Sequence, residues 1–398
     1  MSEGVSTIPT QYTIRRVSLD CASDDLLADW RSISQQLCPD SPQHDPEWLR
    51  GYFEGQAENI FLYALYREGS LCGLVPFILK DWPLKCQLGE LTLASFPLRR
   101  LRLLGGAFNF PDDPAAYEMF FSELMRSDSG FDAVYLEEVP VDSFLWRYLQ
   151  SSELPAKVSK YQPEAPSSHP LLRLEGSFEQ YMGKFSSKHR KNLLREVKKI
   201  REGSLGAMQF TRFQSREEVP FFLEQAIGIS KQTYQWKLHG RGLQASDTLR
   251  KRLVFAAGRG WMRSYLLSCG GQVCAFLVGF QYEGRFLLHE IGYDPSLAKH
   301  SVGTVLQLLT VEDLFAHNRP RILDLGDYGK YKEMLSTESY EQARVFLFRR
   351  GVRSRLIQSI HHGCQLSTQT CSTILERWGL KAKIKRAFRE GATRTAEA

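Results

Sequence analysis

The stretch "HEIGYDPSLAKHSVGTVLQLLTVEDLF", from His289 to Phe315, decides how the second half of this chain folds. An apolar run leads through a turn marked by Pro295 into apolar residues spaced as on one face of a helix. The first turn of a helix exposes backbone N–H groups that lack intrahelical partners, and the aligned peptide dipoles add partial positive charge there. Gly303 lies in that turn and lets an anion approach without a Cβ in the way. The stretch therefore predicts a strand, a loop and a helix start that bind a phosphate or diphosphate.

The predicted anion site covers the end of the loop and the first turn of the helix. It consists of Lys299, His300, Ser301, Val302, Gly303 and Thr304. Lys299 and His300 add positive charge from the loop. A simpler interpretation stays open, in which Ser301 only caps the helix and Gly303 contacts no ligand, because a lone glycine motif is a weak signal.

Short strands and glycine turns surround this stretch. Segments 261–268, 272–281 and 285–293 are typical of strands, and the turns Gly270-Gly271 and Glu283-Gly284 predict that they form an antiparallel meander. A helix (302–317), a short buried strand (321–325), a short helix (328–335) and a last strand (343–350) follow. The order β-β-β-α-β-α-β predicts an α/β (α+β) module with a mixed, mostly antiparallel sheet flanked by helices.

A weaker copy of this pattern occupies the first half of the chain. A hairpin within 60–80 turns at Glu68-Gly69-Ser70, and a helix (113–125), a strand (131–139) and a helix (143–150) follow. Gly69 and Gly270 occupy matching turns, which predicts two copies of one module in tandem. In place of the glycine-helix junction the first copy has "LLGGAFNFPDDP" (103–114), whose prolines suit a turn. The second copy is therefore predicted to be the active one.

Composition predicts the boundaries of these modules. Pro163, Pro166 and Pro170 indicate a linker at 159–170, between a first module (1–158) and a second module (171–350). Residues 351–398 form a basic tail that is helical in part, with an apolar stripe at Leu380, Ile384, Ala387 and Phe388. Such a tail could contact an anionic membrane surface, but packing on the protein body is the favoured interpretation.

The overall composition is that of a soluble globular protein, with 43% hydrophobic and 24% charged residues. The sequence has no apolar segment long enough to cross a bilayer and no secretory leader at its N-terminus, which predicts a cytoplasmic protein. None of the eight cysteines forms a Cys-x-x-Cys pair, and His361-His362-Gly363-Cys364 lacks a second cluster, so we expect no metal site. The net charge of +6 gathers in clusters at 188–201 and 381–389, which suits an anionic ligand or surface without by itself indicating nucleic acid.

The meander, the glycine-helix junction and the following strand together resemble the GNAT superfamily of acyl-coenzyme A-dependent acyltransferases. In that family the loop that opens this helix binds the pyrophosphate of coenzyme A through Gln/Arg-x-x-Gly-x-Gly/Ala. The matching residues 300–305 keep the central glycine and differ at both ends. "FSSKHRKNLLREVKKIREG" is similar to the Ser-x-Lys-x-Arg-x-x-Leu-Arg-Arg helix of the CelD-like and Fem-like branch, whose members commonly carry two GNAT modules. "LDLGDYGKYKEML" is similar to the branch's Asp-x-Gly-x-x-x-x-Tyr-Lys segment, and the resemblance spans 171–350 well and the first half by topology only.

The resemblance implies roles for two neighbouring residues of the strand at 285–293. His289 and Glu290 point to opposite faces because side chains alternate along a strand. GNAT enzymes often place their general base on this strand, so Glu290 is the first candidate for the base and His289 the second. The alternatives are that Glu290 pairs with a core arginine and that His289 is a hydrogen-bonded core imidazole.

Further roles follow from the other two matching segments. Asp324 either orients the acceptor amine or caps the loop 326–329. Tyr331 would protonate the departing thiolate, and Lys332 would stabilise the oxyanion or hold a donor phosphate, unless both only form the exposed face of a short helix. Positive side chains are unfavourable at the N-terminal end of a helix, so three of them predict a bound anion there. They are Lys188, Arg190 and Lys191.

We expect an N-acyltransferase that moves an acyl group from acyl-coenzyme A, as co-substrate and without a metal, to an amine such as that of a sugar or polysaccharide precursor. One alternative is a Fem-like aminoacyltransferase that uses aminoacyl-tRNA and is the only reading with a nucleic-acid partner. Such a protein would carry a helical arm or a broad basic surface, and the sequence has no long heptad insertion. A second alternative is a non-catalytic acyl-coenzyme A-binding or anion-binding protein, which the incomplete glycine motif favours.

Overall fold

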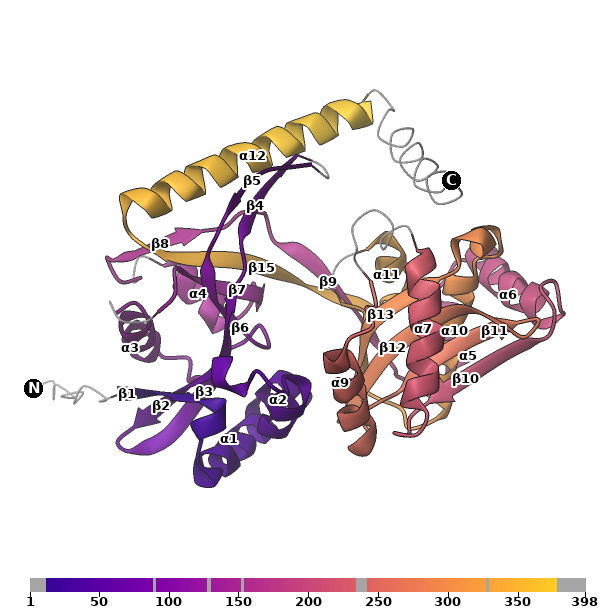
Figure 1. The fold of residues 1–398 in the computed structure, drawn as a ribbon, viewed down its shortest axis with the longest axis horizontal. Coiled ribbons are helices and arrows are strands. Elements are labelled where there is room, and N and C mark those ends of the chain that lie inside the picture. Colours follow the sequence, from indigo (N-terminus) through magenta and orange to yellow (C-terminus); the bar gives the residue numbers. More distant parts are fainter. Residues whose placement is uncertain are drawn as a thin grey trace, which may run out of the picture. The chain divides into compact units, whose positions relative to one another are not determined.

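The computed structural model describes residues 12–88, 91–126, 130–151, 154–233, 242–326 and 329–377. The chain folds as two compact units, one formed by Met1–Ser168 with Tyr340–Lys381 and the other by His169–Ser339 with Ala382–Ala398. Each unit contains β-strands and flanking helices, and most strand pairs are antiparallel (Figure 1). The predicted α/β (α+β) fold with two modules is therefore confirmed.

The first unit is built on a sheet in which the strands follow the order β1-β2-β3-β6-β7-β15, with β8 also paired to β15. Its pairs are antiparallel except for β6 and β7, which run parallel. The strands are β1 (Tyr12–Ser18), β2 (Ile60–Arg67), β3 (Ser70–Asp81), β6 (Arg99–Leu103), β7 (Ala133–Pro140), β8 (Val158–Tyr161) and β15 (Glu338–Arg349). The helices before the last strand are α1 (Asp24–Leu37), α2 (Pro46–Tyr52), α3 (Pro114–Leu124) and α4 (Phe144–Gln150), with short 3₁₀ turns η1 (Leu19–Cys21), η2 (Pro42–His44) and η3 (Ala57–Asn59).

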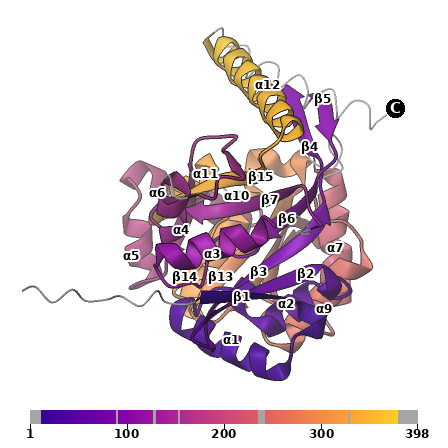
Figure 2. The ribbon, with the colours of Figure 1, turned by 90° about the vertical axis from the view of Figure 1, so that its left-hand side faces the viewer.

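The two faces of this sheet carry different cores because side chains alternate along each strand. Val134 and Leu136 of β7 pack with the aromatic side chains of α3, whereas Ala133 and Tyr135 belong to a smaller cluster on the other face. The smaller cluster is covered by the hairpin of β4 (Leu84–Leu88) and β5 (Leu91–Phe96) and by the long helix α12 (Val352–Arg377). Figure 2 shows α12 beside that hairpin.

The second unit has the strand order β9-β14-β13-β12-β11-β10, in which only β13 and β14 run parallel. The strands are β9 (Ser167–Arg173), β10 (Met208–Phe213), β11 (Ser264–Cys269), β12 (Gln272–Tyr282), β13 (Arg285–Tyr293) and β14 (Ile322–Asp324). The helices are α5 (Phe178–Gly183), α6 (Ser187–Arg201), α7 (Val219–Gln232), α9 (Asp247–Gly258), α10 (Val302–Ala316) and α11 (Lys330–Leu335), with the 3₁₀ helix η4 (Pro295–His300). Both α7 and α10 pack on β12.

The predicted order of elements is confirmed as β11, β12, β13, α10, β14, α11 and β15. Both glycine turns join neighbouring antiparallel strands, and Gly270 and Gly271 have the positive φ values, 59° and 79°, that glycine adopts without strain. The hairpin at Glu68-Gly69 in the first unit is confirmed as well. The turn residues and the spacing of apolar residues in the sequence were therefore sufficient to predict these elements.

The division of the chain differs from the sequence prediction. The expected linker at 159–170 contains β8 and the start of β9, because backbone pairing to neighbouring strands continues despite its prolines. Residues 340–350, predicted to close the second module, belong to the first unit. The reason is that β15 pairs there with β7 and β8, with Phe346 opposite both Tyr135 and Tyr161.

The tail is helical from Val352 to Arg377, as expected in part. The predicted apolar stripe at Leu380, Ile384, Ala387 and Phe388 and the basic cluster 381–389 lie outside the described residues. Among the helices that the structure describes, none combines the length and apolar character needed to cross a membrane.

Candidate functional site

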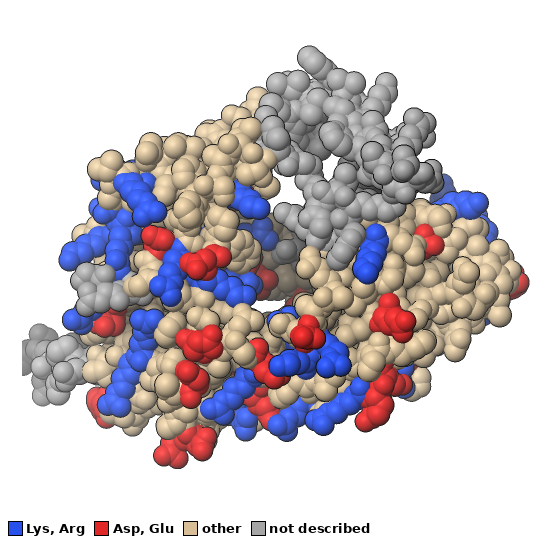
Figure 3. Space-filling model, viewed as in Figure 1, with Lys and Arg blue, Asp and Glu red and all other residues tan. Residues whose placement is uncertain are grey.

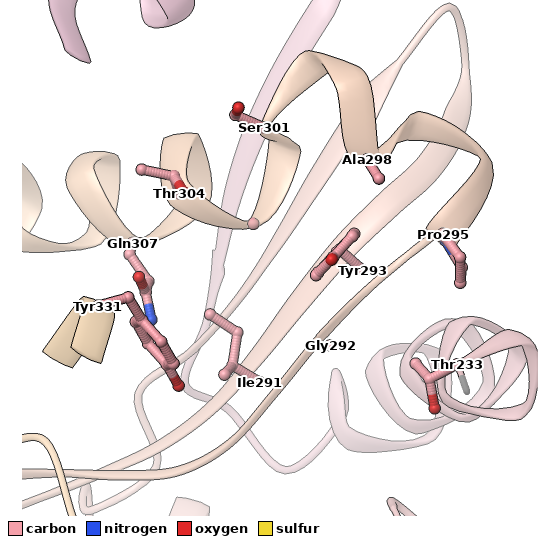
Figure 4. A pocket seen from close by; sticks show the side chains of 11 residues that line it. Thr233, Ile291, Gly292, Tyr293, Pro295, Ala298, Ser301, Thr304, Gln307 and Tyr331 are labelled. Carbon is pink, nitrogen blue, oxygen red and sulfur yellow. The ribbon is translucent and has the colours of Figure 1, made fainter. Parts of the chain in front are cut away.

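A cavity of about 470 Å³ lies at the N-terminal end of α10 in the second unit. Its size falls in the range of pockets that hold small-molecule ligands. It is lined by Thr233, Ile291, Gly292, Tyr293, Pro295, Ala298, Ser301, Gly303, Thr304, Gln307 and Tyr331. Figure 4 shows that these residues come from the end of β13, from η4 and the residue that follows it, from the first turns of α10, from α11 and, for Thr233, from the end of α7.

The strand side of the cavity is formed where β13 extends past its parallel neighbour. β14 ends at Asp324, and its pairing with β13 stops at Leu287, opposite Asp324. The remaining part of β13 runs on to Tyr293 and contributes Ile291, Gly292 and Tyr293 to the cavity. Backbone N–H and C=O groups on such an unmatched strand edge can pair with an extended ligand.

The helix side of the cavity is the uncapped start of α10. Ser301 precedes the helix in the left-handed conformation, with φ 54° and ψ 33°, and within the described part of the chain its side chain makes no capping hydrogen bond. The interpretation of Ser301 as a simple side-chain cap is therefore not what the structure shows. The first backbone N–H groups of α10 keep their positive potential, and Gly303 and Thr304 border the cavity.

Gly303 is needed here for a reason that sequence reasoning did not give. A Cβ at this position would lie 3.0 Å from Cδ1 and 3.4 Å from Cγ of the Tyr293 ring. The absent side chain therefore makes room for Tyr293, which is 42% exposed and itself lines the cavity. Glycine at 303 permits the ring and the helix start to lie together at one wall of the site.

Gln307 and Tyr331 are two polar side chains that line the cavity. Gln307 is buried in an otherwise apolar helix and follows Gly303 by one turn, so it points into the same cavity. Figure 4 shows its amide and the Tyr331 ring facing one another. Sequence reasoning predicted Tyr331 and missed Gln307, although a single glutamine at that helical spacing was a usable signal.

The short helix α11 that carries Tyr331 and Lys332 is fixed at its C-terminal end. Lys184 Nζ donates to the carbonyl oxygen of Leu335 at 2.6 Å, and the Tyr181 hydroxyl donates to the same oxygen at 3.0 Å. A cation and a hydroxyl thus satisfy a carbonyl that a helix end leaves without an intrahelical donor. Tyr181 lies in α5 and Lys184 directly follows that helix, just before the predicted basic helix α6.

The two base candidates on β13 occupy different environments. The register between β12 and β13 shifts so that Val278 faces Glu290 and Gly279 faces Leu288, which leaves His289 as the extra residue of a β-bulge. Glu290 is half-buried, and burial raises the pKa of its carboxyl while the nearby Lys332 lowers it. His289 keeps solvent contact and packs its ring edge-on to Phe280 at 5.6 Å, and crowding by protein together with Arg252 lowers its pKa to about 4. Neither side chain is among those that line the cavity.

Asp324 is held by partners of its own. Its Oδ1 accepts from the Gly326 amide and contacts His169 Nε2, both at 2.8 Å, and its Oδ2 lies 3.7 Å from Arg285 Nε. Burial alone would raise the pKa of Asp324, but these partners outweigh it and the pKa is lowered. The geometry corresponds to the loop-capping alternative.

The remaining predicted residues are not among those that line the cavity. Lys299 and His300 are in η4, and Val302 is buried in the core below the helix start. On α6, Lys188 and Lys191 are exposed and Arg190 is half-buried. The cap of α6 is Ser186, whose Oγ accepts from the His189 amide at 3.3 Å. His361, the first residue of the weak metal-site motif, contacts the Tyr161 hydroxyl through Nδ1 at 2.6 Å.

Comparison with protein families identifies the segment that surrounds the cavity. Residues 187–333 match the family model described as an acetyltransferase (GNAT) domain. This range runs from the start of α6 into α11 and contains the whole of α10. A search of curated proteins found no significant sequence match.

Solved structures share the fold at low sequence identity. The crystal structure of FemX is 10% identical, with a TM-score of 0.50 over 75% of this chain and 90% of that chain. A conserved protein of unknown function from Bacteroides thetaiotaomicron VPI-5482 is 10% identical, with a TM-score of 0.49 over 85% of this chain and 100% of its own. A tandem GNAT protein from the clavulanic acid biosynthesis pathway is 12% identical, with a TM-score of 0.45 over 86% of this chain and 99% of that chain. The match to FemX shows a common fold.

Proposed function

Because residues 187–333 match the acetyltransferase (GNAT) domain model, we propose that the protein transfers an acyl group from acyl-coenzyme A to an amine acceptor. The observation that carries this proposal is the cavity that joins the uncapped start of α10 to the unmatched end of β13. The helix start suits the diphosphate of the donor, and the strand edge suits the amide-rich arm that links the diphosphate to the thioester. The acceptor that we propose is the amine of a sugar or polysaccharide precursor.

The proposed reaction is direct attack of the amine nitrogen on the thioester carbonyl carbon. Glu290 accepts the proton that the amine loses, since its raised pKa makes it a stronger base than an exposed glutamate. The C–S bond then breaks, and Tyr331, at the cavity wall, gives its hydroxyl proton to the thiolate. The positive charge of Lys332 lowers the pKa of Glu290 and so limits the rise that burial causes. Glu290 therefore stays ionised to a lower pH than burial alone would allow. His289 remains the second candidate for the base.

A titration calorimetry experiment with acetyl-coenzyme A tests the donor site. Thr304→Glu places a carboxylate in the first turn of α10 at the cavity wall, where it repels a diphosphate. Thr248→Glu is the matched control, because Thr248 is exposed in the first turn of α9. We expect wild type and Thr248→Glu to bind and Thr304→Glu to lose at least tenfold in affinity. Equal affinity of all three proteins would refute the site.

The two alternatives give different results in the same experiment. A non-catalytic protein would bind acetyl-coenzyme A without turning over any amine. A Fem-like aminoacyltransferase would ignore acetyl-coenzyme A and bind aminoacyl-tRNA in a strongly salt-dependent manner. Figure 3 shows Lys and Arg side chains interspersed with Asp and Glu on the face in view, and this mixed surface favours a small donor over a polyanion.

A further inference from the structure

The first unit contains a buried arginine that forms no hydrogen bond or ion pair with the residues that the structure describes. Arg100 lies on β6 in the interior of the sheet and is 5% exposed. Among the described residues, no acceptor forms a hydrogen bond or ion pair with its guanidinium, and its Nε is fully enclosed. Burying a guanidinium without an acceptor is costly, so the site calls for an anion.

Aromatic rings surround this guanidinium. Its central carbon lies 5.1 Å from the ring centroid of Phe346, 5.5 Å from that of Trp82 and 5.8 Å from that of Tyr135. Cation–π contacts offset part of the desolvation cost but accept no N–H hydrogen bond. Burial lowers the pKa of Arg100 to about 10, so the side chain still carries its charge at neutral pH. The aromatic rings therefore leave the hydrogen-bonding capacity of the guanidinium unused.

The neighbouring carboxylates are already paired with other arginines. Glu137 lies 2.7 Å from Arg102 Nε and 4.0 Å from Arg344 Nε, and it accepts from the Tyr135 hydroxyl at 3.2 Å. The second carboxylate, Glu164, lies 3.8 Å from Arg344. Glu137 also acts on Arg100 through its charge and opposes the effect of burial on the pKa of the guanidinium, but among the described residues it forms no ion pair or hydrogen bond with Arg100.

The helix side of the cluster supplies no negative charge. His361 on α12 is buried, and burial together with the positive charge of Arg100 lowers its pKa, so the imidazole is neutral. Its Nδ1 contacts the Tyr161 hydroxyl. α12 has no acidic residue between Val352 and Ile374.

We propose that Arg100, with Arg102 two residues along the same strand, binds the phosphate group of a small ligand in the first unit. Trp82 lies across both guanidinium groups, at 5.5 and 5.7 Å, and is 41% exposed, so it stands between the cluster and solvent. Two guanidinium groups beside one ring match a doubly charged tetrahedral oxyanion better than a single carboxylate.

The full-length protein and inorganic phosphate test this proposal without any acyl donor. We expect phosphate to bind in calorimetry and to raise the melting temperature by about 2–4 °C at saturation, compared with chloride at the same ionic strength. Comparing the binding of glucose 6-phosphate with that of inorganic phosphate distinguishes a phosphate monoester from free phosphate as the natural ligand. Succinate tests whether a carboxylate binds at the site instead. Binding of succinate with no binding of either phosphate compound would overturn the proposal.

Three variants make the test specific to Arg100. Arg100→Met should abolish phosphate binding while leaving the phosphate-free protein at least as stable, because methionine suits an apolar ring cluster. Arg100→Lys keeps the charge but loses the planar fork, and it should weaken phosphate binding at least tenfold. Arg99→Gln, at an exposed position next along β6, is the control and should bind like wild type. If Arg100→Met destabilises the phosphate-free protein, or if Arg100→Lys binds phosphate as wild type does, Arg100 is structural and the proposal is wrong.

Discussion

The ring of Tyr293 lies directly against Gly303, so that a Cβ at position 303 would be 3.0 Å from its Cδ1. This contact joins the end of β13 to the first turn of α10. Gly303→Ala should therefore displace the ring and weaken acetyl-coenzyme A binding about tenfold. The double variant Gly303→Ala with Tyr293→Ala should recover most of that loss, because the added methyl group then has space. If the losses of binding free energy in the two single variants simply add in the double variant, Gly303 acts on the ligand and not through Tyr293.

Glu290 and Lys332 should set the acidic limb of the pH–rate profile. The pKa of Glu290 is raised by burial, so kcat/KM should fall as the pH drops through a value above that of an ordinary glutamate. Lys332→Met removes the charge that lowers this pKa, and the limb should move to higher pH. Glu290→Gln should reduce kcat by about 10²–10⁴-fold.

The control for these variants is the neighbouring candidate. His289→Gln should leave the position of the acidic limb unchanged if Glu290 is the base. If His289→Gln removes the limb and Glu290→Gln retains activity, the roles of the two residues are reversed.

Tyr331 should matter most for the departure of the thiolate. Tyr331→Phe keeps the ring at the cavity wall and removes only the hydroxyl proton. We expect kcat to fall about 10²-fold, at the low end for a lost general acid, with KM changed little. Steady-state kinetics with acetyl-coenzyme A measures both constants, and Tyr66→Phe in the first unit is the control. A rise in KM at constant kcat would assign Tyr331 to binding alone.

Lys184 provides a test of how α11 is positioned. Lys184→Met removes the donor to the Leu335 carbonyl oxygen while leaving Tyr331 intact. If that contact orients α11, kcat should fall in Lys184→Met with little change in the melting temperature. Lys184→Arg should retain part of the kcat that Lys184→Met loses. Lys198→Met, at an exposed position on α6, is the control. Loss of stability without loss of kcat would indicate a purely structural contact.

Asp324 should contribute to stability above acidic pH. Its pKa in the folded protein is lowered, so its contribution is fully present above the unfolded value and is lost as the pH falls through the folded one. Asp324→Asn should destabilise the protein by about 2 kcal/mol at neutral pH and flatten the acid side of the stability curve. Denaturant unfolding from pH 7 down to 3 measures both effects. An unchanged acid slope in Asp324→Asn would contradict the pairing with His169.

Local sequence signals were enough to predict the meander and the start of α10. Gly270 and Glu283 mark turns, and the spacing of Val302, Val305 and Leu306 marks a buried helix face. These features depend on residues that are close in sequence. The same is true of Gln307, which helical spacing from Gly303 would have identified.

The features that sequence reasoning missed depend on contacts between distant residues. His169 and Asp324 are 155 residues apart and meet only because β9 and β14 are neighbours. The bulge at His289 is a mismatch between two strands and has no signature in one of them. Arg100 looks like an ordinary strand residue until three other segments place rings around it.

The path of β15 has a consequence for how the protein is made. Residues 340–349 complete the sheet of the first unit through β7 and β8, yet they leave the ribosome after the whole of 169–339. During synthesis the early half must therefore wait, with an open strand edge, while the later half folds. The sheet of the first unit therefore cannot be completed before Arg349 has been synthesised.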